Sequence, residues 1–452
     1  MADSPSFFGR GSASIAIFTL AKGALGAGIL ALPQKAMFTG IPLFTFILFL
    51  GSYFTARSVE MISRGCEKAG KYGYEDVTEH HLGKPSAIVL GFSMLLNCYG
   101  SSVAYVIVIR GALSPVFHWL DELAGSCYPQ IIGYSIGVVG LVAMSQYQRL
   151  ESLRFLSVAG VVGTVLATFS VIYALFHDGT ADDIKGASVL ETFQSTIRPN
   201  GGIVDMIGAV STVTFSLCNQ FNVPQVIEGL KTKDAVSVRK VAFGAASIPA
   251  LLYVVTAVAG YLHSGKRTRE NVFGNFAALI EARNIVINLG VVSVVLSIAV
   301  CHILNNFPLR SSVLFFLPPK WTTSAWAQHG IPFLSAVSTI LIGVFFSKLS
   351  MLLGLIGALT GSVICYIMPA LLSIHVEMRA TTDIKVDVER EPLLSEHDTK
   401  RTRSCVSRAL EIARHCPLEC VMVLFGILLA VVGTVTEFYI FFGEAKIDSV
   451  RI

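Results

Sequence analysis

Long apolar runs separated by short polar segments make up most of this chain. A helix of about 20 apolar residues crosses the hydrocarbon core of a bilayer, and the runs approach or exceed that length. The pattern therefore predicts an all-α membrane protein with roughly eleven transmembrane helices embedded in the lipid bilayer. The predicted spans are residues 13–38, 41–63, 87–110, 130–146, 153–177, 203–229, 241–262, 284–307, 330–346, 350–373 and 418–442.

The composition agrees with this pattern and excludes several classes. Hydrophobic residues make up 53% of the chain and charged residues 14%, against about 25% charge in soluble domains. The net charge of +4 is scattered, so nucleic acid is not an expected partner. The nine cysteines show no CxxC pair and no Cys/His ligand spacing, so no metal or other cofactor is expected. Without HExxH, GxxxxGK(S/T) or paired intramembrane aspartates, the sequence does not predict an enzyme.

Two of the predicted spans are interrupted by residues that disfavour a continuous helix. The first carries Gly26, Gly28 and Pro33, with Lys22 beside the break and roughly 13 Å inside the apolar run. The sixth carries the polar run Cys218–Asn219–Gln220. Such breaks are tolerated at membrane depth only where they face protein or a water-filled cavity. We therefore expect the two breaks to form a substrate site.

Each interrupted span is the first of a group of five, which is the spacing of an inverted repeat. Free N–H groups at a break attract a carboxylate, and unwound carbonyls accept hydrogen bonds from an ammonium group, so the site suits a zwitterionic amino acid. The candidate substrate-binding residues are Gly26, Ala27, Gly28, Ser216, Cys218 and Asn219. Asp205 and Glu437 lie near span ends and are interpreted as interfacial.

The distribution of lysine and arginine predicts the orientation. With the N-terminus in the cytoplasm, the inner segments hold 21 of these residues and the outer segments ten, which satisfies the positive-inside rule. The predicted organisation is a cytoplasmic tail, a first repeat, an outer loop, a second repeat, a cytoplasmic loop, and a last span with an outer tail. These parts are residues 1–12, 13–177, 178–202, 203–373, 374–416 and 417–452.

Three stretches resemble the amino acid/auxin permease family of the APC superfamily. They occur in family order in spans 1, 6 and 8, and frame most of the chain. They are Lys22–Gly23 with Gly26–Pro33, Phe215–Asn219 with Val223–Lys231, and Phe307–Arg310. The resemblance implies a five-plus-five inverted repeat of the APC/LeuT type with broken helices 1 and 6, an eleventh helix, and secondary active transport of amino acids.

The resemblance also bears on the coupling ion. Sodium-coupled neutral amino acid members have an asparagine where this chain has Lys22, and a threonine where it has Cys301. An ammonium group repels sodium and a thiol is a poor ligand for it, so the chain is nearer the proton-coupled members. Those carry a histidine where this chain has Thr19, whereas its own candidate is His302 in span 8. Lys22 and His302 are the candidate coupling residues.

Several alternatives stay open at this point. The glycines of the first break can serve close helix packing, Lys22 can reach toward the inner surface, and His302 can be a buried histidine without a proton-carrying role. At the level of function, the alternatives are a membrane-embedded amino-acid sensor of the same fold and a sodium-coupled amino acid symporter. Uptake of labelled amino acids into proteoliposomes separates the sensor from the transporters.

A sorting signal is predicted in the cytoplasmic loop. Glu389, Leu393 and Leu394 form an acidic dileucine pattern, which clathrin-adaptor proteins read. The expected location is the plasma membrane or an endosomal, lysosomal or vacuolar membrane. Replacing Leu393 and Leu394 together by alanine should move the protein away from its steady-state compartment, as seen by microscopy of a tagged chain. An unchanged location would show that the pattern is idle.

Overall fold

The computed structural model describes residues 11–124, 154–185, 189–322, 326–346, 348–389 and 414–450, with a few isolated residues between them. Within these ranges every regular element is a helix. The predicted span at 130–146 and the residues Leu393 and Leu394 lie outside the described part of the chain, and Glu389 is the last residue of its helix.

Eight helices or helical runs in the described residues are long and apolar enough to cross a membrane. Six of them consist of one long α-helix, and the other two are α-helices joined by π-helical turns. The single helices are α3 (Ile41–Ala69), α5 (Lys84–Ala124), α7 (Arg154–Asp178), α11 (Ala235–Ser264), α13 (Ile285–Phe316) and α15 (Ile331–Phe345). The composite runs are α16 (Leu349–Ile356), η6 (Gly357–Gly361), η7 (Val363–Ile367) and α17 (Met368–Glu389), then α19 (Pro417–Leu428), η8 (Leu429–Gly433) and α20 (Thr434–Val450).

One further candidate span is interrupted, and a second interrupted helical segment lies at the other place that the sequence indicated. The first consists of α1 (Ala13–Ala24) and α2 (Gly28–Thr39), which meet at an angle of 61°. The other consists of α9 (Ile203–Ser216), the 3-10 turn η2 (Gln220–Asn222) and α10 (Val223–Glu228). With the predicted span at 130–146 outside the described residues, a total of eleven spans stays a prediction.

Helix extends further into the polar segments than the apolar pattern suggested. The predicted loop 64–86 contains the end of α3 and the short helix α4 (Tyr74–Leu82), and α17 continues through the first part of segment 374–416. The reason is local: α17 meets neither glycine nor proline between Pro369 and Pro392, so nothing in its sequence stops the helix where the apolar run ends. Apolar periodicity marks the membrane-embedded part of a helix and not its full length.

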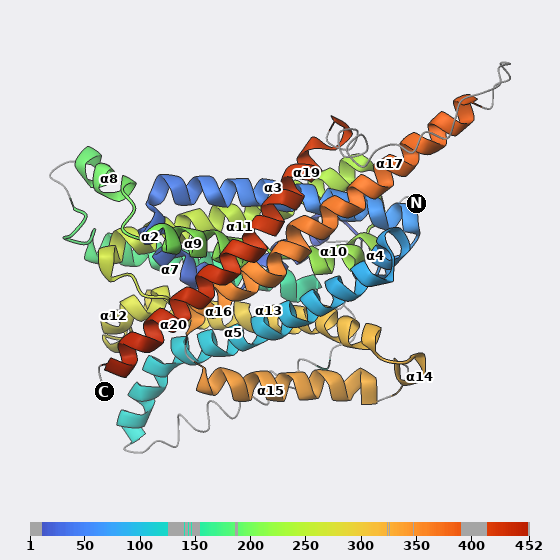
Figure 1. Cartoon of the computed structure of the whole chain (residues 1–452). Coiled ribbons are helices and arrows are strands. Elements are labelled where there is room, and N and C mark those ends of the chain that lie inside the picture. Colours follow the sequence, from blue (N-terminus) through green and yellow to red (C-terminus); the bar gives the residue numbers. More distant parts are fainter. Residues whose placement is uncertain are drawn as a thin grey trace, which may run out of the picture.

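The long helices lie side by side and connect at two ends (Figure 1). The loop helices α4 and α14 (Pro319–Thr322) lie at one end, together with the protruding part of α17. The loop helices α8 (Val189–Ile197) and α12 (Ala277–Glu281) lie at the other end, where α20 also finishes. Predicted inner and outer segments thus separate to opposite ends, and the cytoplasmic assignment of the first end stays a prediction.

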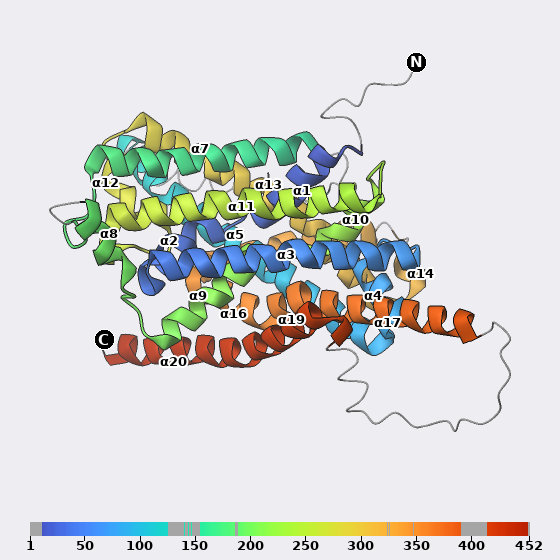
Figure 2. The same cartoon turned by 90° about the horizontal axis from the view of Figure 1, so that it is seen from above.

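The burial pattern is that of a helix bundle surrounded by lipid. On α3, Leu48 is fully buried whereas Phe46 is 63% exposed, and the last span exposes Leu424, Val431 and Val435 in the same way. Figure 2 shows why the last span does so, since α19 and α20 form one edge of the bundle. Apolar side chains that face outward along entire helices fit hydrocarbon as the surrounding solvent.

The second interrupted span packs directly against span 10 through a glycine. A Cβ atom at Gly357 of η6 would lie 2.0 Å from the backbone oxygen of Ser211 in α9. Because this neighbour is a backbone atom of α9, the helix itself would have to shift to make room for the Cβ. Gly357→Ala should therefore destabilise the protein by about 1–3 kcal/mol, measured as a lower melting temperature in detergent. Gly111→Ala is the control, because its Cβ would meet Asn271 at an ordinary 3.5 Å; equal melting of the two variants would contradict this packing.

Candidate functional site

The break in the first span leaves backbone oxygens without helical partners, and side chains of α1 itself and of two other helices satisfy them. The oxygen of Ala24 accepts a hydrogen bond of 2.6 Å from the Tyr253 hydroxyl of α11. The oxygen of Leu25 accepts one of 2.6 Å from the Lys22 ammonium and one of 3.0 Å from the Cys301 thiol of α13. The break is thus fixed in place by three different helices.

The break in span 6 lies against the first one. Tyr253 also lies 3.0 Å from the oxygen of Ser216, the last residue of α9, and the Asn219 amide donates to the oxygen of Leu20 in α1 over 3.2 Å. Gly28 permits this approach, since a Cβ there would lie 2.1 Å from the Ser216 hydroxyl oxygen. The structure therefore places Gly28 against Ser216 and Asn219 against α1; that these residues share a substrate site stays a prediction.

The remaining predicted substrate-binding residues lie around this junction. Ala27 precedes α2 and is fully buried, and Cys218 is buried in the unwound segment after α9. A Cβ on Gly26 would meet the ring of Tyr105 in α5 at 3.0 Å. Tyr105 was not among the predicted residues. The aromatic ring of Tyr105 therefore covers the break at Gly26.

Lys22 is completely buried and engaged on both sides. Its ammonium donates to the oxygen of Leu25 and, over 2.7 Å, to the Ser297 hydroxyl of α13. Ser297 in turn contacts Thr164 and donates to the oxygen of Gly160, both in α7. The lysine therefore joins the broken span to α7 and α13, and does not reach toward the surface.

His302 lies one residue beyond Cys301 and is also buried, at 1% exposure. Neither of its ring nitrogens has a hydrogen-bond partner among the described residues. The Lys22 ammonium donates to the Leu25 oxygen and the Ser297 hydroxyl, and the Cys301 thiol donates to the backbone oxygens of Lys22 and Leu25. The structure thus places the thiol, and not the imidazole, directly on the break.

The junction offers groups of both signs to a ligand. The side-chain oxygens of Asn219 and Asn222 are buried and have no donor within the described residues, so they can accept hydrogen bonds from an ammonium group. The N-terminus of α2 begins at Gly28, and the N–H groups of a first helical turn together with the helix dipole attract a carboxylate. Among the described residues, no group of three His, Cys, Asp or Glu side chains is placed to hold a metal ion.

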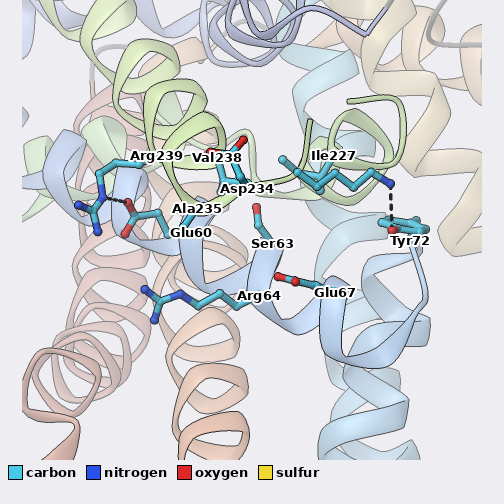
Figure 3. A pocket seen from close by; sticks show the side chains of 11 residues that line it. Glu60, Ser63, Arg64, Glu67, Tyr72, Ile227, Asp234, Ala235, Val238 and Arg239 are labelled. Carbon is cyan, nitrogen blue, oxygen red and sulfur yellow. Dashed lines mark hydrogen bonds and ion pairs between the residues drawn. The ribbon is translucent and has the colours of Figure 1, made fainter. Parts of the chain in front are cut away.

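A separate cavity of about 240 Å³ opens between α3, α10 and the start of α11 (Figure 3). The Glu60 carboxylate on its wall is 4% exposed and pairs with Arg57 and, over 3.2 Å, with Arg239. Lys233 donates to the Tyr72 hydroxyl and lies over its ring. Its lining residues come from neither break, and its charged groups join α3 to α11 at the end of the bundle where α4 lies.

Sequence reasoning missed several residues of the junction. Tyr253 and Ser297 each lie on an apolar span and reach the broken span only through tertiary packing, and Thr164 contacts Ser297. One signal was available for Tyr253, because tyrosine prefers the membrane interface and this one is in the middle of its span. Glu60 gave a similar signal, as a carboxylate beside Arg57 inside an apolar run.

Comparison with known proteins gives the family. The model of the family described as "Transmembrane amino acid transporter protein" matches residues 9–384, which include both breaks and α13. The chain is 26% identical over 368 residues to Vacuolar amino acid transporter 5 of Schizosaccharomyces pombe, covering 78% of this chain and 82% of that protein. It is 25% identical over 307 residues to Amino acid transporter AVT6E of Arabidopsis thaliana, covering 66% of this chain and 62% of that protein.

A further relative is Putative sodium-coupled neutral amino acid transporter 11 of Rattus norvegicus, 24% identical over 275 residues, with 59% of this chain and 58% of that protein covered. Against the plant and rat relatives, the chain therefore spans about three fifths of their length. Among solved structures, a manganese transporter of Eremococcus coleocola aligns over 97% of both chains with a TM-score of 0.51 and 11% identity. That likeness shows the LeuT-like fold. The chain belongs to the transmembrane amino acid transporter family, the amino acid/auxin permeases of the APC superfamily.

Proposed function

We propose that this chain is a secondary active transporter, and not an enzyme, that carries small amino acids across a membrane without sodium and driven by protons. The observation that carries the proposal is the position of Lys22, whose ammonium lies between the Leu25 oxygen and the Ser297 hydroxyl at the break. Membership of an amino acid transporter family supports the class of substrate.

The substrate site in this proposal is the junction of the two breaks. An α-carboxylate suits the N-terminus of α2, and an α-ammonium suits the unpartnered oxygens of Asn219 and Asn222. Both groups are common to all amino acids, so the junction supports the class and leaves the side chain open. Tyr105 beside Gly26 restricts the space that a side chain can use.

Independence from sodium follows from the chemistry around Lys22. Carbonyl and hydroxyl oxygens are the ligands that hard cations such as sodium take, and here the ammonium already bonds to one of each. A second cation beside it would meet repulsion, and the Cys301 sulfur is a poor ligand for a hard cation. While it is protonated, the lysine thus takes the place of a bound cation and braces α1 against α13.

Proton coupling is the second half of the proposal. A completely buried lysine is costly to keep charged, so Lys22 can release its proton when the break rearranges and take one up when the contacts to Leu25 and Ser297 return. His302 supplies a second titratable group on α13. The alternative, a lysine that stays charged throughout, gives a facilitator that ignores protons.

The yeast relative is named a vacuolar transporter, and this name supports a vacuolar or related endomembrane location for the present chain. The predicted dileucine pattern would serve the same destination. Such a membrane separates compartments of different pH, so proton-driven exchange would have an available gradient.

Substitution at Gly28 tests the junction. Gly28→Ala should lower amino acid uptake strongly, because its Cβ would lie 2.1 Å from the Ser216 hydroxyl oxygen, and Gly28→Leu should abolish it. Ser216→Gly removes the obstructing atoms, so Gly28→Ala combined with Ser216→Gly should recover part of the uptake. Uptake by Gly28→Leu equal to the parent, with both proteins folded in the membrane, would rule out this site; Gly111→Leu is the matched control.

Uptake into proteoliposomes across a pH gradient, with sodium replaced by choline, tests the coupling. The parent should take up labelled amino acid without sodium, faster with the gradient, and carry an inward proton current with substrate. Lys22→Ala should lose the response to the gradient, and His302→Ala tests the second group. A strict sodium requirement in the parent would overturn the proposal and favour a symporter. Binding without uptake in any buffer would point to a sensor, and gradient-indifferent uptake would remove only the proton half.

A further inference from the structure

The last span carries a carboxylate that points into the bundle. Glu437 of α20 is 2% exposed, whereas its neighbours Val435, Phe438 and Tyr439 are 65%, 46% and 70% exposed. The helix turns Glu437 toward α9 and α16, which its interfacial interpretation from sequence did not include; its depth in the membrane stays a prediction. A buried glutamate within a membrane span is costly and is seldom kept without a role.

Two glycines on different helices make room for this side chain. A Cβ at Gly354 of α16 would lie 2.0 Å from the Glu437 Oε1 atom, and one at Gly208 of α9 would lie 3.1 Å from it. Any side chain at Gly354 would thus collide with the carboxyl group. The carboxyl group fills a notch between spans 6 and 10. Glycines in membrane helices usually let two backbones approach closely, whereas these two leave space for a side chain from a third helix.

The electrostatic surroundings of Glu437 are sparse. Its Oε1 atom has no hydrogen-bond partner among the described residues. The element α2 packs against both α9 and α16 and carries Lys35, a 5% exposed cation whose charge favours the ionised carboxylate. The other titratable groups on the described elements that pack against α20 do not contact Glu437. Asp205 of α9 accepts from the N–H of Gly202, Lys348 before α16 lies over the Phe441 ring, and Tyr439 faces outward.

Lys35 lies on α2, the half of the first span that follows the break. α2 begins after the break and is bent by 61° from α1, so it can tilt independently of α1 when the site opens or closes. While Lys35 is held near, the Glu437 carboxylate can stay ionised. If α2 carries Lys35 away, an unpaired carboxylate in an apolar notch is no longer sustainable and the group must bind a proton.

We propose that Glu437 is a proton-binding residue of the transport cycle, ionised when α2 presents Lys35 and protonated when α2 withdraws it. The ligand is a proton, and the site is distinct from Lys22, which lies on the other side of the break in α1. The proposal rests on the proposed function, to which it adds a proton-binding group outside the junction of the two breaks.

The test in transport uses Glu437→Gln, which keeps the size of the side chain and fixes it neutral. The pH-gradient stimulation of uptake should be lost, while exchange of labelled for unlabelled amino acid at equal pH persists. Glu419→Gln is the matched control, because Glu419 lies in the same span, is 6% exposed, and accepts a hydrogen bond from Ser373. It should behave as the parent. Stimulation of Glu437→Gln equal to that of the parent would overturn the proposal.

A readout without transport keeps the two proposals separate. In infrared difference spectra of purified protein between neutral and acidic pH, the parent should show the band of a protonated carboxyl that Glu437→Gln lacks and Glu419→Gln retains. Lys35→Met removes the compensating charge, so the band should persist to higher pH. If uptake by the parent does not respond to the gradient, proton coupling of transport is overturned, and the infrared band alone then tests Glu437 as a proton-binding residue. Loss of the band in Glu437→Gln supports this role. A Glu437→Gln spectrum that matches the parent overturns it.

Discussion

Backbone oxygens released inside a membrane must find donors, and the structure depends on how this chain supplies them. Each break leaves carbonyl groups that no helix turn can satisfy, in a medium that offers no water. Tyr253, Lys22, Cys301 and Asn219 supply the donors, from α11, α1, α13 and the other break. Because these donors come from several spans, the breaks can persist only when the helices around them have assembled.

The sequence predicted the breaks correctly because their causes are local. Gly26, Gly28 and the polar residues around Asn219 interrupt apolar runs, and their effect on a helix does not depend on distant neighbours. The spanning helices were predicted for the same reason. The helical end of α17 was missed, since apolar periodicity ends at the membrane surface while helix propensity continues.

The contacts of the candidate site could not be predicted in the same way. Lys22 and Ser297 are 275 residues apart in the chain, and nothing in either local pattern indicates that their side chains meet. The inward direction of Glu437 was missed because proximity to a span end favours the interface, whereas rotation of α20 about its axis decides the outcome. That rotation is fixed by Gly354 and Gly208 on other helices, so no reading of the last span alone could reveal it.

The tyrosine that touches both breaks has only one proton to give. The Tyr253 hydroxyl lies 2.6 Å from the oxygen of Ala24 and 3.0 Å from that of Ser216, and a phenol hydrogen points well at one acceptor at a time. The two breaks therefore compete for a single donor. When one half-helix moves away, the Tyr253 hydroxyl can donate fully to the oxygen on the other half-helix. The loss of one hydrogen bond is then offset by the strengthening of the second. Such an exchange reduces the energy difference between the two arrangements of the junction, and a smaller difference is easier for a small ligand to reverse.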